Sequence, residues 1–313
     1  MGFAAGPMTH PELEVDRRGA KLTAPTFEAL TILVIHHRTP QLLGECLTRL
    51  ARYAVGARVI VVDSGPPSER PALRERLLGA ELLGVPNHSL AHAVNCGLRL
   101  VRTPFVAHMN ADVWVTPETF PALLAALEPT EVAMTGPVAR TADGRRQHQG
   151  PTYTLLYRRL AAQRGEPASL PVPWLSGCLQ VLKWRAVAHV GGMDASLRFY
   201  NEDMEWCFRL WRAGWTCRLV ATEVVHLGGA STPRDPRFLI EGYRGGYRLS
   251  QRFRGPLYRA LHRSAVLAQS ALLRRWGREA HTRAAFDAIF EMFRHQQFDR
   301  SPFGATLGSD TDA

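Results

Sequence analysis

The feature that most constrains the fold is a regular alternation of short apolar runs with segments of helical periodicity. The apolar runs are residues 30–35, 58–62, 81–85 and 105–109. Each is rich in β-branched residues, which is typical of a strand buried on both faces. Apolar residues at helical spacing lie between the runs, at residues 40–53, around Leu73 to Leu78 and at residues 89–100. This alternation predicts an α/β fold with a mostly parallel central sheet.

Two aspartates stand where such a sheet places its ligands. Open parallel sheets bind ligands beyond the carboxyl ends of their strands. Asp63 follows the second apolar run and Asp112 follows the fourth. A carboxylate at the position of Asp63 can accept a hydrogen bond from the imide N–H of a pyrimidine base or from a ribose hydroxyl. The alternative is a turn-capping role, since Ser64, Gly65 and Pro66 follow it.

The motif Asn110-Ala111-Asp112 is a candidate metal site. It lies between an apolar run that ends at Met109 and another that begins at Val113. A carboxylate in such surroundings is costly unless it is paired or binds a cation. A divalent metal, Mg²⁺ or Mn²⁺, that bridges Asp112 to a diphosphate is one reason for its presence. An exposed turn at a strand end is the other interpretation.

The later part of the chain holds a candidate base and a second candidate metal ligand. Glu202 and Asp203 begin a segment, residues 202–213, whose apolar side chains share one helix face. One of these carboxylates can serve as a general base toward an attacking hydroxyl, or both can simply favour a helix start. His226 ends an apolar run and can ligate a metal, although a lone histidine is more often a surface or core residue.

Composition bears on the compartment and the partners. The chain has 38 Lys and Arg against 28 Asp and Glu, so its formal charge is +10. This balance suits a nucleotide diphosphate, a nucleic acid or an anionic membrane surface. The five scattered cysteines form no C-x-x-C pair, which predicts reduced thiols in a cytoplasm. No apolar run approaches the roughly 20 residues of a membrane span, and no secretory signal is visible.

The order of these motifs resembles family-2 glycosyltransferases of the GT-A fold, and within them the rhamnosyltransferase-like branch. The resemblance spans about residues 30–232. It is carried by segments 38–47, 61–64 and 87–97, by Asn110-Ala111-Asp112, by the Gly-Gly-Met-Asp and Glu-Asp block of residues 191–215, and by Val225-His226. The sequence departs from the family pattern at Asn110, which occupies the first position of the D-x-D motif. It departs again at His37, where tyrosine is common, and at Ser64-Gly65, where Asn-x-Ser is frequent.

The resemblance implies a Rossmann-like GT-A domain and a metal-dependent, inverting glycosyltransferase. Its metal would be held by Asp112 and His226, its general base would be Asp203, and Glu202 would orient the acceptor side. The residues that would hold the donor are Asp63, Arg38, Asn87, Asn110 and Asp112. The loop around residue 175 resembles the wall between donor and acceptor, so the acceptor-binding residues would be Trp174, Ser176 and Gly177. A core or interface position is the alternative for Trp174.

Three segments follow from this interpretation. Residues 1–28, which lack a period, are predicted to be a flexible tail. Residues 29–235 would be the GT-A catalytic domain, with a nucleotide-binding half at about 29–135 and an acceptor half at about 136–235. Additional strands are expected near residues 132–134, 178–182 and 218–220. Residues 236–313 are arginine-rich and would be a basic helical extension with a polar end.

The sequence only partly indicates the donor and the acceptor. The donor expected from the branch is deoxythymidine-diphosphate rhamnose, and other nucleotide sugars stay open. The acceptor would be a glycan, soluble or lipid-linked, or a protein. A dehydrogenase or nucleotidylyltransferase is the first rival, but no G-x-G-x-x-G or P-loop motif is present. A catalytically weak carbohydrate- or nucleotide-sugar-binding protein with the same fold is the second. Nucleic-acid binding, which the charge allows, has no motif to support it.

The C-terminal extension carries an apolar stripe among arginines. Its members recur at helical spacing: Leu257, Leu261, Ala265, Ala268 and Leu272. A second stripe follows with Phe286, Ile289, Phe290 and Phe293. Such helices can pack on the catalytic domain, pack on a partner subunit in an oligomer, or lie on an anionic membrane. In the last case Arg259 and Arg263 would face headgroups, and the protein would reach a lipid-linked acceptor at the cytoplasmic leaflet.

Overall fold

The computed structural model describes residues 26–147, 151–163, 168–228, 235–277 and 279–304, so most of the predicted N-terminal tail lies outside it. The strands are β1 Leu30–His36, β2 Arg58–Asp63, β3 Glu81–Gly84, β4 Phe105–Asn110, β5 Val113–Trp114, β6 Val132–Arg140, β7 Ser169–Pro171, β8 Leu179–Lys183 and β9 Thr216–His226. They form one sheet in the order β3-β2-β1-β4-β8-β6-β9-β5, and β7 pairs with β9. The first four strands run parallel, as the alternation predicts.

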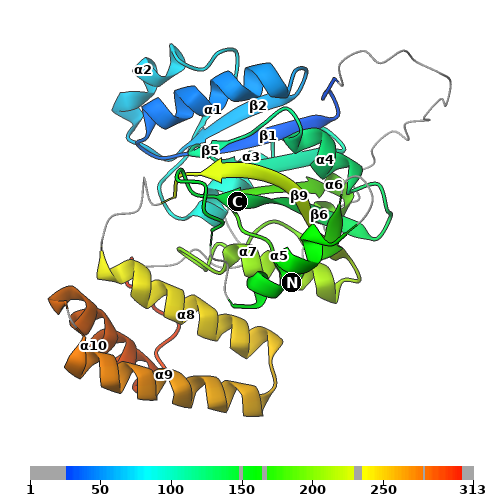
Figure 1. Cartoon of the computed structure of the whole chain (residues 1–313). Helices are drawn as coiled ribbons and strands as arrows, with labels where there is room; N and C mark the ends of the chain where they lie inside the picture. The colour runs from blue at the N-terminus through cyan, green and yellow to red at the C-terminus, as the bar shows by residue number, and fades with distance from the viewer. Residues whose placement is uncertain (1–25, 148–150, 164–167, 229–234, 278, 305–313) are drawn as a thin grey trace, which may run out of the picture.

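Helices cover both faces of this sheet (Figure 1). They are α1 Pro40–Tyr53, α2 Arg70–Arg74 after a short 3-10 turn, α3 Leu90–Leu98, α4 Thr119–Ala125, α5 Pro151–Ala161, α6 Trp184–Val190, α7 Glu202–Arg212, α8 Pro236–Phe253, α9 Pro256–Trp276 and α10 Ala280–His295. Buried side chains of α1 and α4 belong to one hydrophobic core, and those of α3, α6 and α7 belong to another. The predicted α/β fold class is therefore confirmed.

Strand β1 shows why the apolar runs are continuous. Ile32 and Val34 are buried in the core beneath α1, whereas Leu33 between them is buried in the opposite core. Successive side chains of a strand point to opposite faces, so a central strand covered on both sides needs apolar residues at every position.

The parallel register brings the predicted donor-binding residues to one edge. His36 at the end of β1 pairs with Asp63, and Ile35 pairs with Asn110. The segments after β1, β2 and β4 therefore leave the sheet side by side. This is the edge at which open α/β sheets bind ligands.

One predicted helix is shorter than the apolar spacing indicates. α2 ends at Arg74, so Leu77 and Leu78 lie beyond it. Leu78 has a φ of 50° and Gly79 a φ of 88°, which turn the chain back toward β3 and leave the Leu78 side chain 62% exposed. The spacing of leucines could not reveal this turn. Trp211, expected on the buried face of α7, is likewise 37% exposed, and its indole N–H donates to the Val172 carbonyl.

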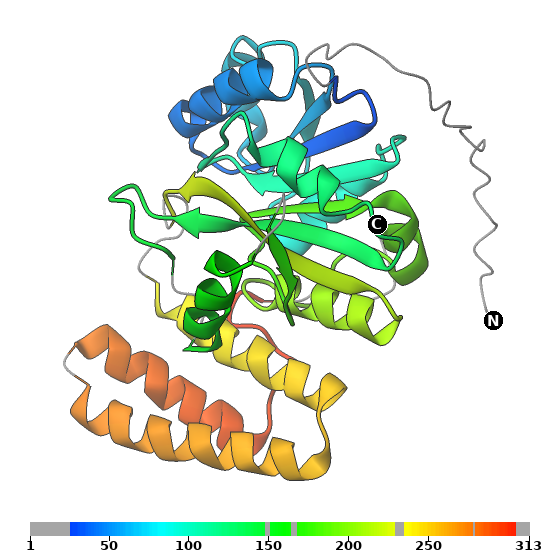
Figure 2. The ribbon, with the colours of Figure 1, turned by 45° about the vertical axis from the view of Figure 1, so that its right-hand side comes forward.

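Helices α8, α9 and α10 form a layer on one side of the α/β domain (Figure 2). Their core contains Tyr247, Val266, Phe286, Ile289 and Phe293, so the predicted stripe of α10 is a packing face. The predicted stripe of α9 faces solvent instead, so of the three alternatives, packing on the catalytic domain does not apply to it. No helix in the described part of the chain is both long and apolar enough to cross a membrane.

Candidate active site

Asp112, His226 and Asn110 meet at the carboxyl edge of the sheet. Strand β5 begins directly after Asp112 and pairs antiparallel with the end of β9, so that Val113 lies opposite His226. The Nε2 atom of His226 lies 3.4 Å from Asp112 Oδ1 and 3.4 Å from the Asn110 side-chain nitrogen. The structure thus brings together the two predicted metal ligands and the asparagine of the same motif.

Gln147 belongs to this cluster, although the sequence analysis does not find it. Its Oε1 lies 2.9 Å from His226 Nδ1, and its Nε2 donates to the His226 carbonyl at 2.8 Å. A glutamine oxygen can only accept, so Nδ1 donates to Gln147 and Nε2 is the imidazole nitrogen that faces Asp112. Gln147 lies in a polar segment without periodicity, and no sequence signal distinguishes it.

The electrostatics of Asp112 favour its charged form. Burial raises the pKa of this carboxyl, but hydrogen bonds from His226 and from the Gly228 N–H hold the pKa below its usual value. No cluster of three or more His, Cys, Asp and Glu side chains that could hold a metal exists among the described residues. One carboxylate and one imidazole therefore fit a Mg²⁺ or Mn²⁺ ion whose remaining ligands are diphosphate oxygens and water, and do not fit a closed structural zinc site.

Asp63 is buried at the end of β2 and is held from three sides. His36 Nδ1 lies 2.9 Å from one carboxylate oxygen, which also accepts from the Gly65 N–H at 3.0 Å, and Arg70 donates to the other oxygen at 3.1 Å. Burial raises the pKa of Asp63, but these three donors bring it below the usual value. Two ionised oxygens offer about four acceptor positions, so one remains for a nucleoside N–H or hydroxyl.

Arg38 and Asn87 lie on loops at the same edge. Arg38 follows β1, is exposed and has a φ of 54°, and Asn87 is exposed in the loop after β3. His37, between β1 and Arg38, is half-buried, and its Nδ1 lies 3.2 Å from the Ser64 carbonyl. Arg70 and His36, which hold Asp63, are not predicted by the sequence analysis.

Glu202 and Asp203 begin α7, as predicted. One Asp203 oxygen accepts from the Gly177 N–H at 2.8 Å, and the other accepts from the Met204 N–H at 2.8 Å. Burial raises the pKa of Asp203. Burial, together with the charge of Asp203, raises the pKa of Glu202 to about 8. Two adjacent carboxyls thus differ in environment: Glu202 is enclosed, whereas Asp203 is half-buried and hydrogen-bonded to the backbone.

The dipeptide Gly177-Cys178 connects the candidate base to the candidate metal site. The Gly177 N–H binds Asp203, and the Cys178 carbonyl accepts from the Asn110 N–H at 3.0 Å. A methyl group on Gly177 would lie 3.3 Å from Asp203 Cβ, so a glycine permits this close approach. The backbone of Gly177-Cys178 therefore contacts both the candidate base and the candidate metal motif.

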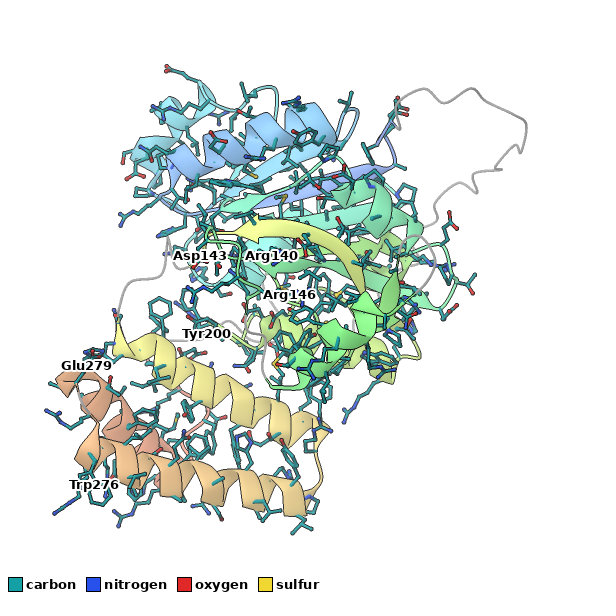
Figure 3. The ribbon with its side chains drawn as sticks, in the orientation of Figure 1. Arg140, Asp143, Arg146, Tyr200, Trp276 and Glu279 are labelled. Atoms are coloured by element: carbon teal, nitrogen blue, oxygen red, sulfur yellow. The ribbon has the colours of Figure 1, made fainter. Side chains whose placement is uncertain are left out.

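The remaining predicted acceptor residues lie beside this dipeptide. Trp174 is half-buried, its ring centroid is 5.3 Å from that of Tyr153, and its carbonyl accepts a hydrogen bond from the Tyr153 hydroxyl. Ser176 is half-buried, and its hydroxyl accepts from the Cys178 N–H at 3.4 Å. Figure 3 shows Tyr200 on the same side of the molecule as Arg140 and Arg146, the side toward which β9 ends.

The sequence of the chain is similar to those of known proteins. The profile of "Glycosyl transferase family 2" matches residues 31–187, about half of the chain. The N-acetylglucosaminyl-diphospho-decaprenol L-rhamnosyltransferase of Mycobacterium tuberculosis (strain CDC 1551 / Oshkosh) is 36% identical over 137 residues, which are 39% of this chain and 43% of the relative. The pre-mycofactocin glycosyltransferase of the same strain is 32% identical over 178 residues, 54% of this chain and 37% of the relative. Each match spans less than half of the relative's length.

Solved structures resemble the fold. A structure of GalNAc-T7 with UDP, GalNAc and Mn2+ has a TM-score of 0.57 at 12% identity, covering 87% of this chain and 58% of that one. A mannosyltransferase of Pyrobaculum calidifontis in complex with GDP-Man and Mn2+ has a TM-score of 0.54 at 17% identity, covering 86% of this chain and 88% of that one.

The sheet and its neighbours among solved structures define a GT-A fold, the architecture of transferases that use nucleotide-sugar donors. The chain belongs to glycosyl transferase family 2, and its sequence is similar to that of a rhamnosyltransferase. The family resemblance noted in the sequence is thereby confirmed.

Proposed function

We propose that this glycosyltransferase transfers a sugar from a nucleotide diphosphate to an acceptor hydroxyl with inversion at the anomeric carbon. The observation that carries the proposal is the link through Gly177-Cys178, which joins Asp203 to the Asn110-Asp112 motif by two hydrogen bonds. Inversion needs a base on one face of the sugar and a stabilised leaving group on the other. Asp203 and the Asn110-Asp112 motif are each hydrogen-bonded to the same dipeptide, which supports these two roles.

Asp112 and His226 would hold the divalent metal against the donor diphosphate. When bound, such an ion supplies Lewis-acid stabilisation of the negative charge on the departing diphosphate. Gln147, which accepts from Nδ1, would orient the Nε2 atom of His226 toward the metal. The charged form of Asp112, favoured by His226 and the Gly228 N–H, matches a cation rather than a neutral ligand.

Asp203 would take the proton from the acceptor hydroxyl during attack. A base is effective when its pKa is raised toward the working pH while it stays ionised, and burial moves the pKa of Asp203 in that direction. Glu202, with a pKa of about 8, is protonated at neutral pH. It would therefore serve as a neutral neighbour that orients the acceptor side, and Asp203 would be the ionised partner.

The proposed donor is deoxythymidine-diphosphate rhamnose, and the proposed acceptor is a lipid-linked glycan. A curated relative is named a rhamnosyltransferase that acts on a diphospho-decaprenol, which supports both choices. Asp63 would bind the base or ribose, with Arg38, Asn87 and Asn110 along the same edge. Trp174, Ser176 and Gly177 would contact the acceptor.

A thermal-shift screen against nucleotide sugars, with and without Mn²⁺, tests the donor. A ligand at about 100 times its Kd stabilises the folded state by about 2.7 kcal/mol, so the correct donor raises the Tm most, and only with metal. Asp112→Ala should abolish both the metal-dependent shift and turnover. Asp203→Asn should keep the shift and lose on the order of 10²-fold or more in kcat. Near-normal turnover by Asp203→Asn would contradict its role, and a donor shift without any turnover by the wild type would favour a binding protein.

A further inference from the structure

Helix α9 is built with its apolar side outward. Only two of its 21 residues, Val266 and Ser270, are buried. The large apolar side chains of its outer face are at least half exposed: Leu257 74%, Tyr258 51%, Leu261 62%, Leu272 50% and Trp276 67%. A surface helix of a globular protein normally turns this stripe to the core. The outer face of α9 is therefore an unpartnered apolar surface.

Arginines of α9 face the neighbouring helix instead. Arg263 donates to the Phe293 and Arg294 carbonyls at 3.0 and 3.1 Å, which caps the end of α10. Arg274 lies 3.8 Å from the Phe290 ring centroid and 3.4 Å from Asp287. The expectation that Arg263 faces lipid headgroups is therefore wrong, because this side chain is engaged within the helical layer.

The charge around the outer face selects its partner. Arg263 and Arg274, which are engaged within the helical layer, do not add to the charge of the outer face. Residues 254–276 contain no acidic residue, and Arg254 and Arg275 are exposed. A second copy of the chain would bring these like charges together, whereas an anionic bilayer offers charges of opposite sign. Tyr258 and Trp276 stand near the two ends of the helix, and aromatic side chains of this kind suit the membrane interface.

We propose that the outer face of α9 docks on an anionic lipid bilayer. Trp276, at the C-terminal end of α9, is labelled on the same side of the view as Tyr200 (Figure 3). The contact would bring the enzyme to a lipid-linked acceptor, and this role rests on the proposed function. Binding of α9 to the bilayer does not itself require sugar transfer.

Vesicle sedimentation tests the contact without any substrate. The wild type should bind phosphatidylcholine vesicles that contain phosphatidylglycerol, ignore pure phosphatidylcholine, and be released at high salt. Leu261→Ser with Leu272→Ser should lower the partition coefficient on the order of tenfold or more. The matched control, Val55→Ser with Leu155→Ser, removes two aliphatic side chains that are 57% and 63% exposed on other helices or loops, and should bind normally.

Two outcomes overturn the docking proposal. The first is a wild type that ignores anionic vesicles at low salt. The second is a concentration-dependent dimer in sedimentation velocity that Leu261→Ser with Leu272→Ser dissolves, because the face is then an interface between copies. Failure of sugar transfer alone leaves the vesicle result unchanged, so it is distinguishable from failure of the proposed function.

A separate set of contacts joins α8 to the loop that precedes Asp203. Glu241 and Arg244 are fully buried and paired at 2.6 Å. Glu241 accepts from the Arg198 N–H at 3.0 Å, and Arg244 donates to the Ser196 carbonyl at 2.8 Å. The buried pair thus holds the backbone at two points of the loop, five and seven residues before Asp203.

The last turn of this loop is strained and rests on the same helix. Tyr200 and Asn201 have φ values of 65° and 72°, which non-glycine residues rarely adopt. The Asn201 side chain donates to the Gly242 carbonyl at 3.0 Å. A methyl group on Gly245 would lie 2.8 Å from the Asn201 side-chain nitrogen. Two consecutive residues in this conformation persist only where surrounding contacts hold them.

We infer that α8 positions Asp203, and that Glu241, Arg244 and Gly245 are positioning residues for the proposed base. Helix α8 is then part of the framework that holds the site and not an appendage to it. The inference rests on the assignment of Asp203 as base, but the geometry that it describes can be measured without a substrate.

Adjacent glycines of α8 provide a matched pair for the test. Gly245→Ala places its methyl group against Asn201, whereas Gly246→Ala meets its nearest atom, Asn201 Oδ1, at an ordinary 3.7 Å. Both changes have the same effect on helix propensity. Amide hydrogen exchange of Gly177, whose N–H binds Asp203, should accelerate about tenfold or more in Gly245→Ala and stay at the wild-type rate in Gly246→Ala.

Turnover of deoxythymidine-diphosphate rhamnose is the second measurement. Gly245→Ala should lower kcat on the order of tenfold while the Kd for deoxythymidine diphosphate with Mn²⁺ is unchanged, and adding Asn201→Gly should restore part of kcat because the clash is removed. Asn201→Gly alone is the alternative variant if Gly245→Ala does not fold. It removes the hydrogen bond to the Gly242 carbonyl and should also lower kcat. Wild-type exchange of Gly177 and wild-type kcat in these variants would overturn the inference. Absence of turnover in the wild type concerns the proposed function instead.

Discussion

Glu202 offers a quantitative test of the division of roles between the two adjacent carboxyls. Its side chain is 6% exposed, and Oε2 has no hydrogen-bond partner in the part of the chain that the structure describes. Burial, followed by the charge of Asp203, raises its pKa from 4.5 to about 8. We therefore predict that Glu202 is a neutral acid in the folded protein at neutral pH and ionised in the unfolded chain.

The sign of the effect on stability follows from proton binding. Between 4.5 and about 8 the folded state keeps a proton on Glu202 that the unfolded state has released. The stabilisation that Glu202 contributes to the folded state is therefore complete below the pKa that Glu202 has in the unfolded chain. It decreases as pH rises and is lost once pH passes the pKa that Glu202 has in the folded state. The difference between the two pKa values, at 1.36 kcal/mol per pH unit, sets an upper limit of about 5 kcal/mol.

Substitution by glutamine removes this dependence, because an amide of the same shape stays neutral at every pH. The free energy of unfolding of Glu202→Gln, measured in urea, should be within about 1 kcal/mol of the wild type at about pH 5. At about pH 9 the variant should be more stable by several kcal/mol, up to about 5. Titrating groups that do not interact with Glu202 are common to both proteins and cancel in the difference, whereas the neighbouring Asp203 does not. Glu118→Gln, at an exposed glutamate, controls for the loss of one charge.

A stability difference between Glu202→Gln and the wild type that is the same at both pH values would refute the prediction that Glu202 is neutral in the folded protein. Glu202 would then be ionised in the folded state, and the two carboxyls would compete for the role of base. A difference of the opposite sign would mean that the charged form is stabilised by the fold.

Three further predictions concern the metal, the donor and the proposed base. Gln147→Leu should weaken Mn²⁺ binding in the presence of deoxythymidine diphosphate about 10- to 100-fold, measured by electron paramagnetic resonance of free Mn²⁺, and unchanged affinity would show that the contact of Gln147 with His226 is incidental. Asp63→Ala should weaken free deoxythymidine diphosphate as much as its sugar conjugate in calorimetry; a loss confined to the conjugate rules out a nucleoside contact. Because burial raises the pKa of Asp203, activity should fall with decreasing pH along a limb that lies above the ordinary value of 3.8, and an acid limb at or below that value contradicts the assignment.

The strands of the nucleotide-binding half could be predicted from the sequence because their burial is local information. A strand covered on both faces is apolar at most of its positions, and β1, β2 and β4 show this in their residues. The parallel order then places the residues after these strands at one edge, so Asp63 and Asp112 could be assigned to a common site before any contact was known.

The partners of these residues depend on contacts that leave no trace in the local pattern. Gln147 meets His226, and Arg70 meets Asp63, only because β6, β9 and the turn after β2 converge in space. Asn95 similarly makes two hydrogen bonds of 2.8 Å with the backbone of Met193, a residue 98 positions away. Gln147 lies in an aperiodic segment, and Arg70 and Asn95 lie in helices whose apolar spacing does not say what their polar side chains contact.

The C-terminal helices separate the two kinds of information most clearly. The apolar spacing of α9 and α10 is enough to predict that both are helices, since period is a property of the sequence alone. Which stripe is buried depends on the order in which three helices stack, and the sequence contains both stripes without ranking them. In the tertiary structure the α10 stripe is buried and the α9 stripe is in solvent. Helix α8 packs against the loop that precedes Asp203. The sequence pattern does not determine these outcomes, because they depend on packing between segments far apart in the chain.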